Sequence, residues 1–211
     1  MDLTTVDHLL TTTRSVRQRL DLKRPVEPEI IERCLEIAVQ APTGGNVCRY
    51  HFMIVADAPK KKAIGNWYKQ AFAIAYPQQA LAERRKTHAR DVASWTYLVE
   101  HLGEVPLMII PCLDTRLEGD LTPQRMAGFY GNILPAAWSL MLALRARGLG
   151  SAWTTLALRH ELDIARLLQI PANVTPAALL PVAYFTGADF HPAKRVPAKE
   201  RTYWDTWGAR R

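Results

Sequence analysis

PEIIERCLEIAVQAPTGGNVCRYHFMIVA, residues 28–56, contains both patterns that decide the fold. After Pro28 the apolar residues recur at helical spacing, which predicts an amphipathic helix over 28–41 that ends at Pro42. The apolar run 51–56 is typical of a short strand. A helix followed by a strand across a glycine turn indicates helices packed on a sheet.

The alternation of helix and strand signals continues along the rest of the chain. The further elements that we expect are strands over 106–111 and 178–185, helices over 3–12 and 124–147, and helical pieces within 59–102. The helix over 124–147 is apolar on nearly every side, so it must be buried centrally or in a subunit interface. Because no long Gly/Ser linker or repeat separates these elements, we expect a single α+β domain over 1–211.

The composition describes an ordinary globular chain. Its 211 residues are 48% hydrophobic and 22% charged, which disfavours disorder and coiled-coil arrays. Lys and Arg exceed Asp and Glu by 27 to 20, a net charge of +7. The basic residues are spread in small groups without a nucleic-acid-binding motif, so we expect no nucleic-acid partner.

The sequence indicates neither a membrane nor an export route. The most apolar stretch, 133–144, is twelve residues long and contains Pro135, whereas a membrane span takes about 20 residues. The first residues lack a basic region followed by an apolar one. Cys34, Cys48 and Cys112 are an odd number without close pairing, so we expect a reducing cytoplasm.

Several familiar catalytic motifs are absent from the sequence. It has no Gly-x-Gly-x-x-Gly after a strand, no Walker loop, no His-Glu-x-x-His and no Gly-x-Ser-x-Gly. The six histidines never fall at metal-ligand spacing, so we expect no metal site. Cys48 and His51 are the one close Cys/His pair, which leaves open a nucleophile–base dyad or, more simply, a histidine that opens a strand.

Two segments offer groups that suit a phosphate and a heterocycle. Residues 13–17 read TRSVR, whose arginines and hydroxyls suit a phosphate dianion; the alternative is a solvated basic segment at a helix end. Residues 41–46 read APTGGN, a rigid turn whose bare backbone groups suit a planar heterocycle; the alternative is a plain helix-to-strand loop.

Two later segments add weaker signals. Residues 147–156 read RGLGSAWTTL, where glycines after the buried helix let backbone approach a ligand closely; the alternative is an ordinary turn at a helix end. Residues 192–195 read PAKR, which alone is only a basic turn after the last strand.

The order and spacing of these four segments resemble the FMN-dependent nitroreductase family over roughly residues 8–197. The family's Arg-Arg-Ser-Val-Arg-like opening is matched by Arg14-Ser15-x-Arg17, and its Pro-Ser-x-x-Asn element by Pro42-Thr43-x-x-Asn46. Its Gly-Leu-Gly-Ser-like turn is matched at 148–151, and the arginine after its last strand by Arg195.

The resemblance implies the architecture of an α+β protein. It implies an α/β/α sandwich around a central mixed, mainly antiparallel sheet, and an obligate homodimer with two FMN sites at the subunit interface. It places the core at about 8–197 and leaves the tail 198–211 to wrap the partner subunit.

Residue by residue, the resemblance implies three groups of FMN contacts. Arg14, Ser15 and Arg195 hold the phosphate, and Arg17 lies beside N1 and the C2 carbonyl; a third phosphate contact by Arg17 is the alternative. The isoalloxazine ring is lined from the other subunit by Pro42, Thr43, Gly44 and Asn46. The last group is Trp153, Thr154, Thr155 and Leu156, with the backbone around Thr155-Leu156 facing N5.

The sequence departs from the family's pattern at three places. Thr13 replaces the family's first arginine, so the phosphate site has one cation fewer, and Cys48-Arg49 replaces its Gln-Pro. Tyr97 and Glu100 fall near the Asn and Lys that some members place on the pyrimidine ring and are poor substitutes, so we assign them no contact.

The activity that the resemblance implies is that of an NAD(P)H-dependent FMN oxidoreductase. FMN carries the hydride chemistry, so no catalytic side chain is expected. NADH or NADPH donates and leaves, and a small nitroaromatic or quinone acceptor follows, in ping-pong order. The lid of the acceptor pocket is expected within 66–130. The alternatives are a flavin-binding protein that sequesters or processes FMN with little turnover, and a basic interaction module without a cofactor.

Overall fold

The computed structural model describes residues 1–119 and 121–211. These residues form two compact units. The larger unit is Arg14–Gly187, and the smaller combines Met1–Thr13 with Ala188–Arg211.

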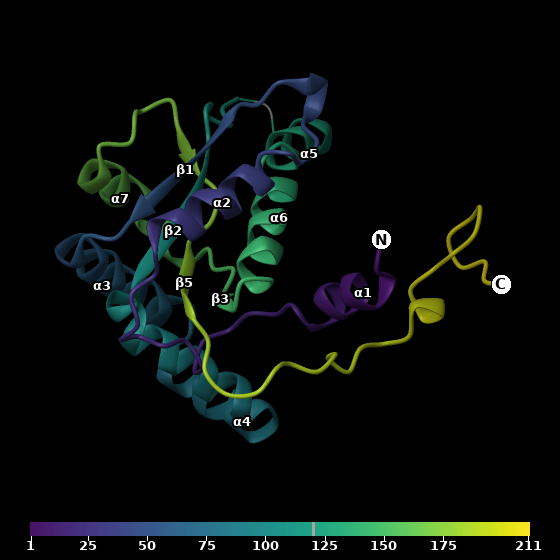
Figure 1. The fold of residues 1–211 in the computed structure, drawn as a ribbon, viewed down its shortest axis with the longest axis horizontal. Coiled ribbons are helices and arrows are strands. Elements are labelled where there is room, and N and C mark those ends of the chain that lie inside the picture. The colour runs from purple at the N-terminus through teal and green to yellow at the C-terminus, as the bar shows by residue number, and fades with distance from the viewer. Residues whose placement is uncertain (120) are drawn as a thin grey trace. The chain divides into compact units, whose positions relative to one another are not determined.

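The larger unit is built on a central antiparallel sheet (Figure 1). Its strands are β1 (Tyr50–Val55), β2 (Leu107–Leu113), β3 (Leu149–Ser151), β4 (Thr175–Pro176) and β5 (Leu180–Tyr184). The order is β1-β2-β5-β3, with β4 paired to β2, and every ladder between them is antiparallel. A parallel bridge between Ser15 and Ser151 makes the sheet mixed, as expected.

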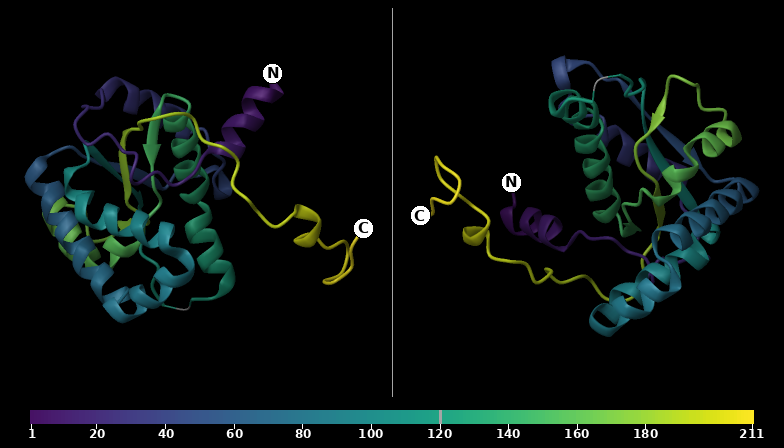
Figure 2. Two further views of the ribbon diagram at one scale, coloured as in Figure 1. Left: turned by 90° about the horizontal axis from the view of Figure 1, so that it is seen from below. Right: turned by 180° about the vertical axis from the view of Figure 1, so that it is seen from behind.

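The helices of the larger unit lie on both faces of this sheet (Figures 1 and 2). The α-helices are α2 (Pro28–Ala38), α3 (Ala58–Ala75), α4 (Gln78–His101), α5 (Pro123–Gly131), α6 (Leu134–Arg145) and α7 (Glu161–Leu168). Three 3-10 helices join them: η1 (Gly44–Asn46), η2 (Leu102–Glu104) and η3 (Leu156–His160). α2 and α6 cover one face, and α3, α4 and α7 lie on the other, which confirms the expected α+β sandwich.

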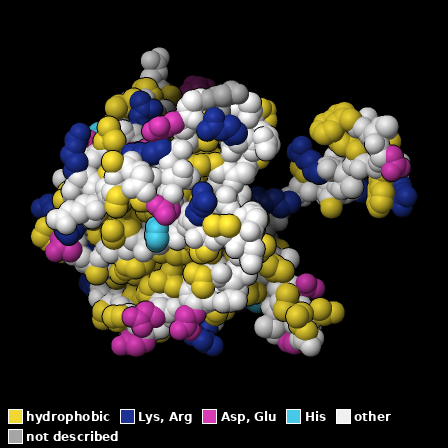
Figure 3. All heavy atoms as spheres, turned by 90° about the horizontal axis from the view of Figure 1, so that it is seen from above, with side chains coloured by type: hydrophobic (Ala, Val, Ile, Leu, Met, Phe, Trp, Pro, Cys, Tyr) yellow, Lys and Arg dark blue, Asp and Glu magenta, His cyan; other side chains and the backbone are white. Residues whose placement is uncertain are grey.

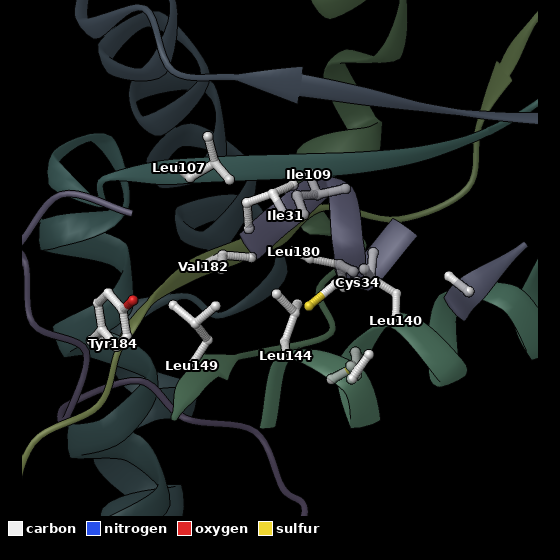
Figure 4. Packing of buried hydrophobic residues seen from close by; sticks show 13 residues of the cluster. Ile31, Cys34, Leu107, Ile109, Leu140, Leu144, Leu149, Leu180, Val182 and Tyr184 are labelled. Carbon is white, nitrogen blue, oxygen red and sulfur yellow. The ribbon is translucent and has the colours of Figure 1, made fainter. Parts of the chain in front are cut away.

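The main hydrophobic core lies between the sheet and the pair α2 and α6 (Figure 4). Leu107 and Ile109 of β2 point into it because alternate residues of a strand share a face. Leu140 and Leu144 of α6 and Cys34 of α2 meet them from the helix side, each fully buried. Burying a leucine or isoleucine contributes about 1.5–3 kcal/mol, so these contacts fix the two helices on the sheet.

The stretch predicted as one helix over 124–147 is two helices. Residues 132–133 separate α5 from α6, and Pro135 occupies the first turn of α6, where proline favours a new helix start. Together, residues Pro123–Arg145 are long and apolar enough to cross a membrane, by length and composition alone. Of the most apolar 18-residue part of this stretch, 44% is buried, and buried core helices meet the same criterion.

Three other segments differ from the sequence prediction. Residues 148–151 were expected as a turn, but only Gly148 turns, with φ of 75°, and Leu149–Ser151 is strand β3. Three residues are too few to show an alternating pattern, which is why this strand was missed. The helix expected over 28–41 ends at Ala38, and the strand expected over 106–111 continues through Pro111 to Leu113.

The smaller unit contains α1 (Leu3–Thr12) and η4 (Ala198–Glu200). Asp2 caps α1 by accepting a hydrogen bond from the Thr4 N–H at 3.1 Å. The His8 Nε2 atom lies 2.7 Å from the Asp189 carboxylate, which ties the two chain ends together. The helix predicted over 3–12 is confirmed.

Candidate functional site

The segment that contains the predicted phosphate ligands lies alongside strand β3. The Val16 N–H donates to the Ser151 carbonyl at 2.8 Å, beside the bridge between Ser15 and Ser151. A Cβ on Gly150 would lie 2.9 Å from the Val16 Cβ, so only glycine allows this approach. The fold therefore brings Arg14, Ser15 and Arg17 next to the turn that contains residues 153–156.

Arg17 is a half-buried cation with no carboxylate within 4 Å among the residues that the structure describes. Burial lowers the pKa of Arg17, and the nearby Tyr68 and Asp91 partly oppose that shift. Removing a charge from water is costly unless a partner compensates. An anionic or electron-rich ligand beside Arg17 would supply that compensation.

Tyr68 of α3 joins this site, although the sequence analysis did not assign it there. The Thr154 hydroxyl donates to the Tyr68 hydroxyl oxygen at 3.3 Å, and both side chains are buried. Burial raises the pKa of Tyr68, so the phenol stays neutral near Arg17. Tyr68, Phe72 and Tyr76 recur every four residues on one helix face, which is the signal that could have placed Tyr68 here.

The backbone that follows Thr154 offers unused donors. Thr154 exchanges two backbone hydrogen bonds with Leu179, at 3.1 and 2.8 Å, and is thereby fixed to the sheet. The N–H groups of Thr155 and Leu156 have no hydrogen-bond partner within 1–119 and 121–211, because they open η3. Thr155 is exposed, so this pair of amides faces outward from a rigid base. Trp153 instead packs its ring against the main core.

The glycine loop over residues 42–46 lies beside α5, away from the segment 14–20 (Figure 1). Gly45 and Asn46 adopt left-handed backbone conformations, with φ of 62° and 55°. The Gly44 N–H donates to the Asn132 Oδ1 atom at 3.0 Å, and Asn132 Nδ2 donates to the Gly128 carbonyl at 2.8 Å. Asn132 therefore holds the loop, a role that no sequence pattern indicated.

Within one chain, the structure groups some of the predicted flavin ligands and separates others. Arg14, Ser15, Arg17 and residues 153–156 lie together, whereas Pro42, Thr43, Gly44 and Asn46 lie elsewhere on the larger unit. Arg195 is an exposed residue of the smaller unit, so its place beside the phosphate stays a prediction.

A cavity of about 330 Å³ lies on the larger unit at a different place. It is lined by His51, Phe52, Met53, Cys112, Asp114, Ile170, Pro171, Asn173 and Val174. None of the predicted flavin ligands lines it. Among the described residues, no group of three or more His, Cys, Asp and Glu side chains could hold a metal ion.

The structure is that of an α+β protein in which a segment with two arginines, Arg14 and Arg17, lies beside the edge strand β3 of the sheet. The chain belongs to the nitroreductase family, whose family model matches residues 10–184.

Two relatives illustrate the range of this family. The chain is 26% identical over 176 residues to the "Putative NADH dehydrogenase/NAD(P)H nitroreductase" of Methanothermobacter thermautotrophicus, covering 82% of this chain and 73% of that one. It is 28% identical over 189 residues to the 5,6-dimethylbenzimidazole synthase of Rhodospirillum rubrum, covering 87% and 82%. Membership of the nitroreductase family identifies the chain as an oxidoreductase.

A solved structure confirms the fold. Oxidised iodotyrosine deiodinase bound to FMN and 3-iodo-L-tyrosine matches with a TM-score of 0.69 over 92% of this chain and 98% of that chain. The two sequences are 21% identical, so the match concerns the fold alone.

Proposed function

We propose that the protein is an FMN-dependent oxidoreductase that transfers a hydride from NADH or NADPH to small nitroaromatic or quinone acceptors in ping-pong order. The observation that carries this proposal is Arg17, a half-buried cation with no carboxylate within 4 Å in the described chain, together with the unpaired amides of Thr155 and Leu156. These groups suit the electron-rich edge of a flavin, and the structural relative, iodotyrosine deiodinase, binds FMN.

When bound, FMN supplies the hydride chemistry. The guanidinium of Arg17 would stabilise negative charge at the N1 and C2 carbonyl edge of the flavin, and low solvation would strengthen that effect. The N–H groups of Thr155 and Leu156 would donate toward the N5 edge, next to the residue that the Thr154–Leu179 pair fixes to the sheet. Tyr68 is buried against Thr154, and its apolar ring would exclude water from this part of the site.

The proposed phosphate ligands are Arg14, Ser15 and Arg195. Arg14 is half-buried, and Ser15 is exposed next to the bridge with Ser151. An arginine fork with an adjacent hydroxyl suits a phosphate dianion. Arg195 completes the site in this proposal.

The active form in this proposal is a homodimer. The loop over 42–46 lies away from Arg17 in one chain, so a second copy must bring Pro42, Thr43, Gly44 and Asn46 to the isoalloxazine. Large apolar residues are exposed on α2, α5, α6 and the loop before β1: Ile37, Val39, Val47, Met126, Tyr130, Leu134 and Trp138. Figure 3 shows hydrophobic side chains gathered on one face of the larger unit. Exposed apolar patches mark interaction surfaces, and tail 198–211 would wrap the partner.

The cellular compartment in this proposal is the cytoplasm. All three cysteines are free, with Cys34 and Cys112 buried and Cys48 exposed. Free thiols of this kind persist in reducing compartments.

An anaerobic titration tests the proposed activity. The purified protein should show a flavin spectrum that NADH or NADPH bleaches and a nitroaromatic restores. A flavin spectrum that neither nucleotide bleaches would favour the alternative of flavin sequestration. A colourless protein that binds no added FMN would refute the proposal.

A further inference from the structure

A row of aromatic rings runs from the candidate site along α3 to α4. Tyr68 and Phe72 are buried, and Tyr76 and Trp95 are half-buried. The ring centroids of Phe72 and Tyr76 lie 5.0 Å apart, and those of Tyr76 and Trp95 lie 5.6 Å apart. These spacings are those of contacting aromatic pairs, so Phe72, Tyr76 and Trp95 form one set of contacting rings.

An arginine lies at each end of this row. Arg17 interacts electrostatically with Tyr68 at one end. At the other end the guanidinium carbon of Arg84 lies 4.9 Å from the centre of the Trp95 ring. Tyr68 and Tyr76 are eight residues apart, about 12 Å along a helix, so the two arginines are too far apart to share one small anion.

Helix α4 borders the candidate site through the segment that follows His88. Asp91 of α4 is close enough to Arg17 to raise its pKa. Asp91 and Trp95 are four residues apart after the kink at His88, so they share one helix face, and the Arg84 guanidinium reaches this face at the Trp95 ring. Figure 2 shows α3 and α4 packed side by side along the larger unit.

Arg84 has no carboxylate within 4 Å among the described residues, whereas the neighbouring Lys86 is paired with Glu83 at 2.6 Å. The Arg84 guanidinium contacts the Trp95 ring, and such a contact at an exposed site contributes about 0.5–1 kcal/mol. A carboxylate that accepts two hydrogen bonds from the guanidinium is a stronger partner. Arg84 is therefore available to an anionic ligand that stacks on Trp95.

A kink in α4 lies between Arg84 and Trp95. His88 interrupts α4 with φ of −134° and ψ of 42°, so Arg84 precedes the kink and Trp95 follows it. The kink explains how two residues eleven positions apart in one helix come into contact.

We propose that the half-buried rings of Tyr76 and Trp95 form an acceptor subsite, and that Arg84 selects planar aromatic acceptors that bear a carboxylate. The inference rests on the proposed function and adds a substrate class to it. The rings supply the stacking surface, and Arg84 supplies the one recognition element that distinguishes an acid from its neutral ester.

The decisive experiment compares 4-nitrobenzoate with methyl 4-nitrobenzoate in the FMN-saturated enzyme. The variant is Arg84→Gln, and the control is Arg85→Gln, which removes the same charge one position along the helix and about 100° around it. We expect R84Q to lower kcat/KM for the acid about tenfold and to leave the ester within about twofold. R85Q should change both acceptors by less than about twofold.

Three outcomes would overturn the inference. These are equal losses for acid and ester in R84Q, an acid-specific loss of the same size in R85Q, and a loss confined to oxidation of NADPH, which would assign Arg84 to the binding of the electron donor.

Calorimetric titration of 4-aminobenzoate and its methyl ester into the same proteins separates this inference from the proposed function. Weaker binding of the acid alone in R84Q supports the subsite even in a protein without turnover, and equal binding refutes it.

Discussion

Arg17 is the residue on which the redox role depends. A guanidinium beside N1 meets a neutral oxidised flavin but an anionic reduced one, and this differential contact shifts the reduction equilibrium. A loss of about 1.4 kcal/mol of preference equals about 30 mV for a two-electron couple. Arg17→Ala should therefore lower the midpoint potential by tens of millivolts while oxidised FMN stays bound, as measured by potentiometry. An unchanged midpoint with weakened FMN binding would assign Arg17 to the phosphate instead.

The proposed phosphate contacts of Arg14 and Arg195 are tested by comparing the binding of FMN with that of riboflavin. Each should contribute a charge-assisted contact to the phosphate, so Arg14→Ala or Arg195→Ala should weaken FMN binding by about 2 kcal/mol or more. Riboflavin lacks the phosphate and should bind the variants as it binds the wild type. Fluorescence titration with both ligands decides, and equal losses for both would remove these arginines from the phosphate site.

Among single residues, the sequence analysis found those that occur together in short segments. It missed those whose contacts are with residues far away in the sequence. Arg14, Ser15 and Arg17 lie in one segment, so their chemistry could be inferred from neighbouring residues. Tyr68 and Asn132 act through partners 86 and 88 positions away, and no local pattern encodes such contacts.

Among the elements, the junction of α3 with η2 depends on two glycines. A Cβ on Gly65 would lie 2.8 Å from the Gly103 backbone nitrogen, and Lys61 Nζ donates to the carbonyls of Val105 and Pro106 at 2.7 and 2.8 Å. Gly65→Ala must push these backbones apart, and overpacking costs about 1–3 kcal/mol. Denaturant unfolding should show this loss.

Gly128 supplies the matched control, because a Cβ there meets nothing within 4 Å inside α5. Gly128→Ala should be neutral or should stabilise by up to about 1 kcal/mol through helix propensity. If both alanine variants unfold at the same denaturant concentration, close packing at Gly65 does not limit stability.

The elements themselves were predictable where their apolar pattern is long. The strands near 51–56 and 106–111 were found because each is an apolar run of six residues, and helix 3–12 was also found. Strand β3 and the break before α6 were missed because three residues show no period and Ile133 continues the apolar pattern across the break.

At the scale of the whole molecule, the proposed dimer places α6 between the core of its own subunit and the partner subunit. One side of α6 contains Leu140 and Leu144 in the core, while Leu134 and Trp138 on the other side remain 41% and 43% exposed. Full burial of such a side chain is worth about 1.5–3 kcal/mol, and a second copy of the chain would supply the part that remains exposed to water. Because the flavin site would use both copies, FMN affinity should depend on dimerisation.

The substitution Trp138→Glu tests whether α6 forms the dimer interface and whether FMN binding depends on the dimer. A carboxylate buried at the interface without a partner is costly, so sedimentation should show a monomer, and FMN should be lost with it. The control is Leu162→Glu on α7, since Leu162 is 59% exposed and lies on the opposite side of the sheet. That variant should remain a dimer with bound FMN.

A wild-type protein that sediments as a folded monomer while retaining FMN would contradict the shared site, because one chain alone keeps residues 42–46 away from Arg17.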